Sequence, residues 1–116
     1  MFIHTDDIIN RRGLNKGGRA QKFVDSEVLR YCDPLVPFQT GFLKGSGTRG
    51  TVIGSGVIKY IAPYAKPNYY NNAGNGTQGM NNGGLRGRLW FARMKTRYKE
   101  AIHNGLVQSL HRHHAP

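Results

Sequence analysis

Histidine, cysteine and carboxylate side chains are the groups from which a metal or catalytic site would have to be built in this chain. Four of its five histidines, His103, His111, His113 and His114, lie near the C-terminus. Zinc sites take imidazole and thiolate ligands from a fixed scaffold, but the single cysteine, Cys32, is distant in sequence and the cluster adjoins the last residue. We therefore interpret the histidines as a solvated tail and predict no metal site.

The carboxylates and serines form no catalytic pattern. General acid–base chemistry usually needs a placed pair of carboxylates or histidines, whereas five of the six acidic residues lie in positions 1–33. Ser46, Ser55 and Ser109 belong to no nucleophile motif, and the Gly-Ser-Gly segments at 45–47 and 54–56 lack the lysine of a phosphate-binding loop. We predict turns at both segments, no enzymatic activity and no cofactor.

Positive charge is the strongest compositional signal. The 116 residues include 17 Lys and Arg against 6 Asp and Glu, for a formal charge of +11. Residues 1–33 hold six basic and five acidic residues, while residues 34–116 hold eleven basic residues and one acid, Glu100. This excess indicates a polyanionic partner, nucleic acid first and an acidic protein surface second. A merely solvated cationic surface is the alternative.

The length of the chain predicts one domain over residues 1–116. Its composition predicts that this domain does not lie in a membrane. A single cysteine excludes an intramolecular disulfide and is typical of a reducing cytoplasm. No apolar run approaches the ~20 residues that span a bilayer. The segment Met1–Asp7 is acidic where a secretory signal would be basic, so we expect synthesis in the cytoplasm without export.

Two amphipathic helices are expected to position the remaining segments of the chain. Apolar residues at three- and four-residue spacing predict a helix over about 19–32, ended by Asp33-Pro34 because the residue before proline avoids the α region. A second helix is predicted over about 88–110, anchored by Trp90 and Phe91. Residues 1–18 are predicted to be an extended N-terminal arm, with a short edge strand as the alternative for residues 2–9.

The middle of the chain is predicted to form a small antiparallel sheet, giving an α+β fold. After Pro37, Thr40 would cap one short turn over 42–46 that Gly41 enters. β-branched residues at 51–53 and 57–61 flank three residues containing two glycines, which predicts a β-hairpin near 51–61. Residues 71–87, rich in Asn and Gly, are predicted to be a long, mobile loop.

Several side chains are candidates for contact with partners. Tyr69 and Tyr70 adjoin the Asn/Gly-rich loop and are predicted to be exposed subunit contacts. Like-charge pairs at i,i+4 in the last helix, Arg93/Arg97 and Lys95/Lys99, are favoured if an anion faces them. The basic residues at turns and strand ends that we expect to face DNA are Lys44, Arg49, Lys59, Lys66, Arg86 and Arg88.

Short motifs along nearly the whole chain resemble, in order, the minor capsid and neck proteins of tailed bacteriophages. They are the helix segment 21–29, Val36-Pro37-Phe38-Gln39-Thr40-Gly41 with Leu43-Lys44, Ile53-Gly54-Ser55-Gly56, Ala62-Pro63-Tyr64-Ala65 and residues 90–95. The residues that carry the resemblance are Pro37, Thr40, Gly41, Leu43, Gly54, Gly56, Pro63, Tyr64, Trp90 and Phe91. Where such relatives have an acidic residue before Thr-Gly, this chain has Gln39.

This resemblance implies a structural virion protein of the head–tail junction. It would form a homo-oligomeric connector ring around the DNA channel, next to head-completion or adaptor and tail-terminator proteins, with non-specific contact to genomic DNA. Tail completion is one role within this group. The alternative from composition alone is a small basic monomeric nucleic-acid-binding module.

Overall fold

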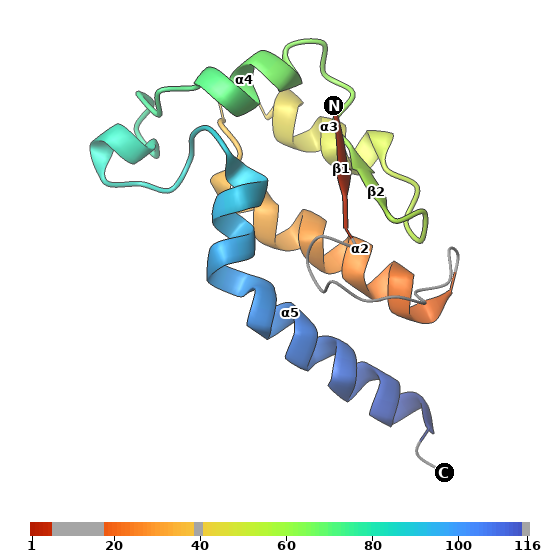
Figure 1. Cartoon of the computed structure of the whole chain (residues 1–116). Coiled ribbons are helices and arrows are strands. Elements are labelled where there is room, and N and C mark those ends of the chain that lie inside the picture. The colour runs from red at the N-terminus through yellow and green to blue at the C-terminus, as the bar shows by residue number, and fades with distance from the viewer. Residues whose placement is uncertain (6–17, 39–40, 115–116) are drawn as a thin grey trace.

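The computed structural model describes residues 1–5, 18–38 and 41–114, with the side chains of 110–114 excepted (Figure 1). The fold is α+β, as predicted. In chain order the elements are β1 (Phe2–His4), α2 (Arg19–Cys32), the 3-10 helix η1 (Asp33–Leu35), α3 (Phe42–Gly50), β2 (Val57–Lys59), α4 (Ala65–Asn71), the 3-10 helix η2 (Met80–Asn82) and α5 (Trp90–His114).

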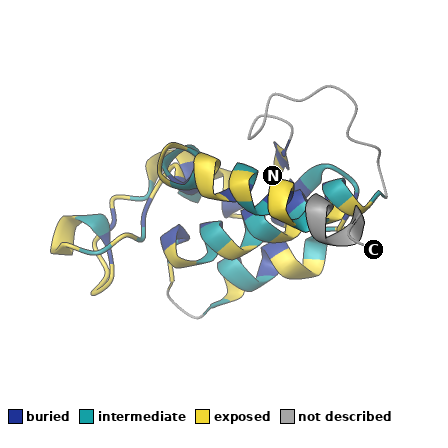
Figure 2. Cartoon of the chain, turned by 90° about the horizontal axis from the view of Figure 1, so that it is seen from below, coloured by how far each residue is buried: buried dark blue, intermediate teal, exposed yellow. Residues whose placement is uncertain are grey.

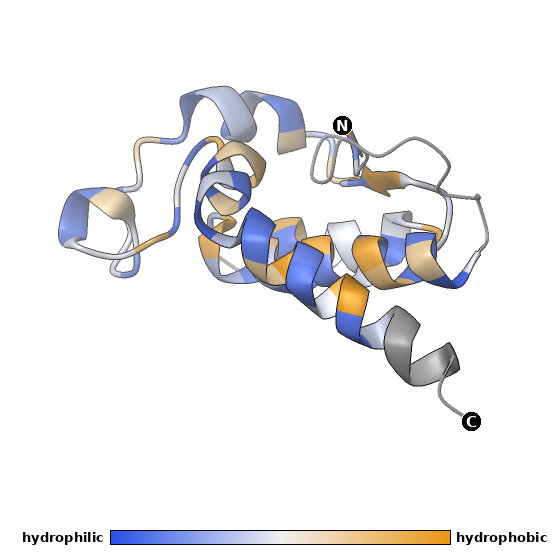
Figure 3. Ribbon diagram, turned by 60° about the horizontal axis from the view of Figure 1, so that its bottom comes forward, coloured by the Kyte–Doolittle hydropathy of each residue, from blue (hydrophilic) through white to orange (hydrophobic). Residues whose placement is uncertain are grey.

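Helices α2 and α5 run antiparallel and form most of the core. The rings of Tyr31 and Tyr98 stack with centroids 4.6 Å apart, and Phe23 lies against Gly105. The predicted bounds of α2 are confirmed, while α5 begins two residues later and ends four residues later than predicted. The buried core residues of these helices are Val24, Val28, Cys32, Trp90, Phe91, Met94, Ile102 and Leu106. Figure 2 shows the burial along the chain, and Figure 3 shows hydrophilic residues recurring along α5.

The sheet pairs residues 2–4 with residues 57–59, so the predicted hairpin near 51–61 is wrong. Strand β1 pairs antiparallel with β2, in the register Phe2 to Lys59 and Ile3 to Ile58. Residues 51–53 form no strand, and the Thr51 hydroxyl instead accepts a hydrogen bond from the Lys59 amide at 2.9 Å. The edge-strand alternative for the N-terminus is confirmed at Phe2–His4.

A buried carboxylate explains why the glycine segment does not close a hairpin. Asp25 is fully buried in α2, and its Oδ2 accepts hydrogen bonds from the amides of Gly54 at 2.8 Å and Gly56 at 3.0 Å. Its Oδ1 accepts from the Thr5 hydroxyl at 2.8 Å and from Gln21 Nε2 at 2.9 Å. The Asp25 side chain thus holds both the residue that follows β1 and the segment that precedes β2 against α2.

The structure contains two further helices: one lies where a short turn was predicted, and the other was not predicted. Gly41 has φ +81°, which confirms the tight entry, but the predicted short turn over 42–46 is the nine-residue helix α3. Thr40 lies outside the described residues, so its capping role stays a prediction. Helix α4, which contains Pro67, is not among the elements predicted from the sequence. Pro67 is tolerated because it falls in the first turn, where its missing amide would have no helical partner.

Candidate functional site: the projecting loop and the cationic surface

The Asn/Gly-rich segment stands away from the rest of the molecule. We call residues 72–85 the projecting loop, and all three views place it at one end of the chain's long axis (Figures 1–3). Its backbone is closed by hydrogen bonds from the Met80 amide to the Arg86 carbonyl at 2.9 Å and from the Arg86 amide to the Gln78 carbonyl at 3.0 Å. It is a long loop, as predicted, with η2 as its regular element.

Asparagine side chains and close backbone contacts give this loop an internal structure that its composition does not predict. Asn82 Nδ2 donates to the carbonyls of Asn75 at 3.0 Å and Gly76 at 2.9 Å. A Cβ at Gly79 would overlap the Gly74 carbonyl. The glycines therefore allow the backbone segments to approach one another, and the asparagines supply the hydrogen bonds that hold them.

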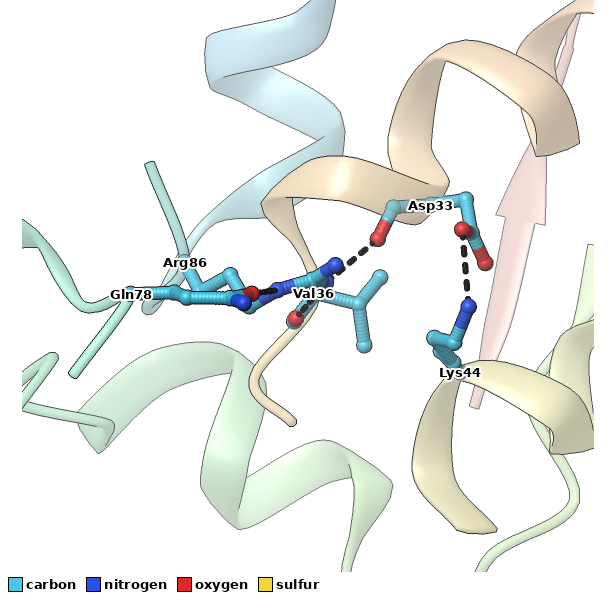
Figure 4. Close-up of polar contacts among 5 residues, drawn as sticks. All are labelled: Asp33, Val36, Lys44, Gln78 and Arg86. Atoms are coloured by element: carbon cyan, nitrogen blue, oxygen red, sulfur yellow. Dashed lines mark hydrogen bonds and ion pairs between the residues drawn. The ribbon is translucent and has the colours of Figure 1, made fainter. Parts of the chain in front are cut away.

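Arg86 attaches the loop to the body (Figure 4). Its Nη1 donates to the carbonyls of Asp33 and Val36, both at 2.7 Å, and its Nε donates to Gln78 Oε1 at 2.7 Å. Beside it, Lys44 Nζ forms an ion pair with Asp33 Oδ2 at 3.0 Å. Both cations, which the sequence marks as candidates to face DNA, are thus engaged within the fold.

Arg93 is a second anchor that sequence reasoning missed. Its guanidinium donates to the carbonyls of Leu85 at 2.6 Å, Arg88 at 2.7 Å and Leu35 at 3.2 Å. Burial lowers the pKa of Arg93, and the nearby positive charges of Arg88 and Arg97 lower it further. The sequence shows Arg93 only as half of a like-charge pair, because its acceptors are backbone carbonyls, which every residue carries, and one of them, Leu35, is distant along the chain.

A cavity of about 550 Å³ separates the loop from the segment Pro37–Phe38. Its walls are loop backbone, amide side chains and the Phe38 ring, with the Arg86 guanidinium 5.4 Å from the ring centroid. Amides, one aromatic ring and one arginine can bind a polar group. They do not provide the paired titratable side chains that acid–base catalysis uses.

The other four basic candidates are exposed: Arg49, Lys59, Lys66 and Arg88. Arg49 lies over the Phe42 ring and Lys59 Nζ lies 5.3 Å from the Phe2 centroid. Within the described part of the chain, ion pairs join Arg30 to Glu27 and Lys44 to Asp33, and no others form. The four exposed candidates therefore have no acidic partner among the described residues and can meet an external anion.

The aromatic and motif residues divide between core and surface. Tyr69 is only 8% exposed, so its predicted exposure is wrong; its hydroxyl accepts from the Ala92 amide at 3.3 Å, which holds α4 against α5. Tyr70 is 56% exposed and fits a contact role. Of the remaining motif residues, Leu43, Gly54, Trp90 and Phe91 are buried, Pro37 and Gly56 are partly exposed, and Pro63 and Tyr64 are exposed.

Within the side chains that the structure describes, groups that could bind metals or react are dispersed or buried. In the described residues no three His, Cys, Asp or Glu side chains gather closely enough to hold a metal ion. His103 is partly buried in α5, whereas the side chains of His111, His113 and His114 lie outside the described part. Burial raises the pKa of the Cys32 thiol to about 12. No helix in the described ranges is long and apolar enough to span a membrane.

Comparison with protein-family models, with curated proteins and with solved structures finds no match to this chain.

Proposed function

We propose that this chain is a non-enzymatic structural protein of the head–tail junction of a tailed bacteriophage. It would self-associate into a ring around the DNA channel and dock against head-completion or adaptor proteins on one side and tail-terminator proteins on the other. The virion is its site of action after assembly in the host cytoplasm. The ordered series of short motifs from residue 21 to residue 95 suggests this class.

The projecting loop is the observation that carries the proposal. It is an internally bonded extension, fixed at its base by Arg86 and Arg93, that lies outside the packed body. Extensions that project from a small subunit gain contact area only when a neighbour covers them, and the loop contains no catalytic side-chain pair. Association with other subunits therefore explains the projecting loop better than a monomeric role does.

The surface charge suits passage of DNA without sequence reading. Arg49, Lys59, Lys66 and Arg88 are exposed and lack acidic partners among the described residues. Exposed lysines and arginines attract phosphates through contacts that salt weakens strongly. A channel lined in this way would tolerate DNA and let it move.

The same unpaired cations favour one alternative, a monomeric nucleic-acid-binding module. Two measurements separate the functions: sedimentation velocity of the full chain over a range of concentrations, and a salt titration of its binding to duplex DNA. A ring subunit should associate with itself and bind DNA weakly as a monomer. A monomer that binds DNA tightly at physiological salt, with a steep salt dependence, would favour the module.

A further inference from the structure

A groove between α2 and α5 lies away from the projecting loop, toward the other end of the molecule. It has a volume of about 490 Å³. Phe23, Glu27 and Tyr31 line it from α2, and Ala101, Gly105 and Gln108 line it from the second half of α5. In Figure 1 this half of α5 runs away from the loop, and the molecule is 50 Å long against 27 and 21 Å across.

The α2 side of the groove is a wall of aromatic and charged side chains. Arg30 pairs with Glu27 and lies 4.4 Å from the Tyr31 ring centroid, and Tyr31 in turn stacks on Tyr98. Because the Glu27 and Arg30 charges cancel, this wall has no net charge. Gly105 forms the floor of the groove, and its lack of a side chain deepens the groove, since a Cβ there would lie 3.1 Å from Phe23.

Charge limits where two copies of this chain can meet. A formal charge of +11 makes most approaches between copies repulsive. The projecting loop contains no charged residue over positions 72–85, and the groove wall is neutral through its internal ion pair. Contact between loop and groove thus brings no like charges directly together, and the loop's amides can hydrogen-bond to the groove's Glu27 and Gln108.

We infer that the projecting loop of one copy docks in the α2–α5 groove of a second copy. This inference rests on the self-association in the proposed function and assigns its contact surfaces. Because the two surfaces differ and lie apart on the molecule, the contact is head-to-tail, and repeating it builds a closed ring or an open filament.

Two substitutions test this pairing without disturbing the fold. A Cβ at Gly76 would have nothing within 4 Å, so Gly76→Arg adds bulk and charge to the loop alone. Ala101 is exposed on α5, so Ala101→Arg obstructs the groove alone. Asn104→Arg adds the same charge at an exposed α5 position outside the groove and is the matched control.

In sedimentation velocity, the association constant for self-association should be at least tenfold lower for Gly76→Arg and for Ala101→Arg than for the unsubstituted chain. Asn104→Arg should associate as the unsubstituted chain does. An equimolar mixture of Gly76→Arg and Ala101→Arg should form dimers, because one intact loop and one intact groove remain. Assembly of either variant at the level of the control, or a mixture that stays monomeric, would overturn the inference.

A cross-linking experiment separates this inference from the ring itself. A short bismaleimide should join Gly76→Cys to Ala101→Cys in a mixture, but not Gly76→Cys to Asn104→Cys; Cys32 is buried in all three. If the unsubstituted chain sediments as a monomer yet the first pair cross-links, the contact stands and the ring proposal fails. If the first pair joins no better than the control pair, the contact is refuted.

Discussion

Removal of the Asp25 carboxylate should destabilise the fold more than any surface change. Asp25 accepts four hydrogen bonds of 2.8–3.0 Å, from the Thr5 hydroxyl, Gln21 Nε2 and the amides of Gly54 and Gly56. In Asp25→Ala, Gln21 and Thr5 still bond to each other at 2.8 Å. The two glycine amides, one buried and one partly buried, lose their acceptor.

The magnitude follows from those two amides. A buried donor left without an acceptor costs about 1–3 kcal/mol, so two amides and the weakened Thr5–Gln21 contacts should together cost about 3–5 kcal/mol. For a chain of this length that loss lowers Tm by about 10–20 °C. Asp25→Asn keeps one oxygen for the glycine amides and should cost about 1–3 kcal/mol, less than the alanine variant.

Urea denaturation of Asp25→Ala, Asp25→Asn and the exposed neighbour Ser26→Ala measures these differences. Hydrogen exchange at the Thr5 amide, which donates to the Gly56 carbonyl at 3.0 Å, should accelerate in the alanine variant because β1 loses its link to α2. An Asp25→Ala protein as stable as Ser26→Ala would refute the claim that this carboxylate fixes the sheet.

Three further predictions follow from single positions. Gly41→Val should cost about 1–3 kcal/mol in urea denaturation, because φ is +81° and a Cβ would lie 3.1 Å from Phe38; an unchanged midpoint would contradict this. Arg86→Lys cannot reproduce the bonds to Asp33, Val36 and Gln78, so limited proteolysis within residues 72–85 should quicken at least tenfold while the urea midpoint moves little, and equal cleavage rates would count against the anchor. Cys32, with its pKa raised from 9.0 to about 12, should have on the order of a thousandfold less thiolate at pH 8 than an unfolded chain. It should therefore resist maleimide until unfolding, and, since the folded thiol keeps its proton while the unfolded one loses it, this group's contribution to stability should fall as pH rises from 9 to 12. Rapid labelling of native protein would show that Cys32 is accessible.

Local patterns predicted the two long helices because apolar spacing selects their buried faces, and in α5 it places Trp90, Met94, Ile102 and Leu106 in the core. The predicted end of α2 at Cys32 is confirmed, but the predicted reason is wrong: Asp33 keeps helical dihedrals before Pro34 (φ −51°, ψ −47°), and the chain continues as η1 until Val36 becomes extended. The hairpin failed for the opposite reason. Gly54 and Gly56 look like a hairpin turn in isolation, but Asp25, about 30 residues earlier, binds their amides and leaves β2 to pair with β1.

The candidate site was harder to predict because its important contacts are between distant segments. The basic residues were visible in the sequence, but Arg86 and Arg93 bond to carbonyls of Asp33, Leu35 and Val36, more than 45 positions away. Likewise, Asn and Gly content predicts a mobile loop, whereas Asn82 bonds to the backbone across the loop. Composition gives the residue types and leaves their acceptors undetermined.

Native mass spectrometry of the full chain at physiological ionic strength determines whether the protein forms a ring. The proposed ring predicts a discrete closed oligomer, seen as one multiple of the 13.0 kDa subunit mass that stays fixed as concentration rises. A chain that remains at 13.0 kDa at every concentration, and that binds duplex DNA tightly in that form, would contradict the account.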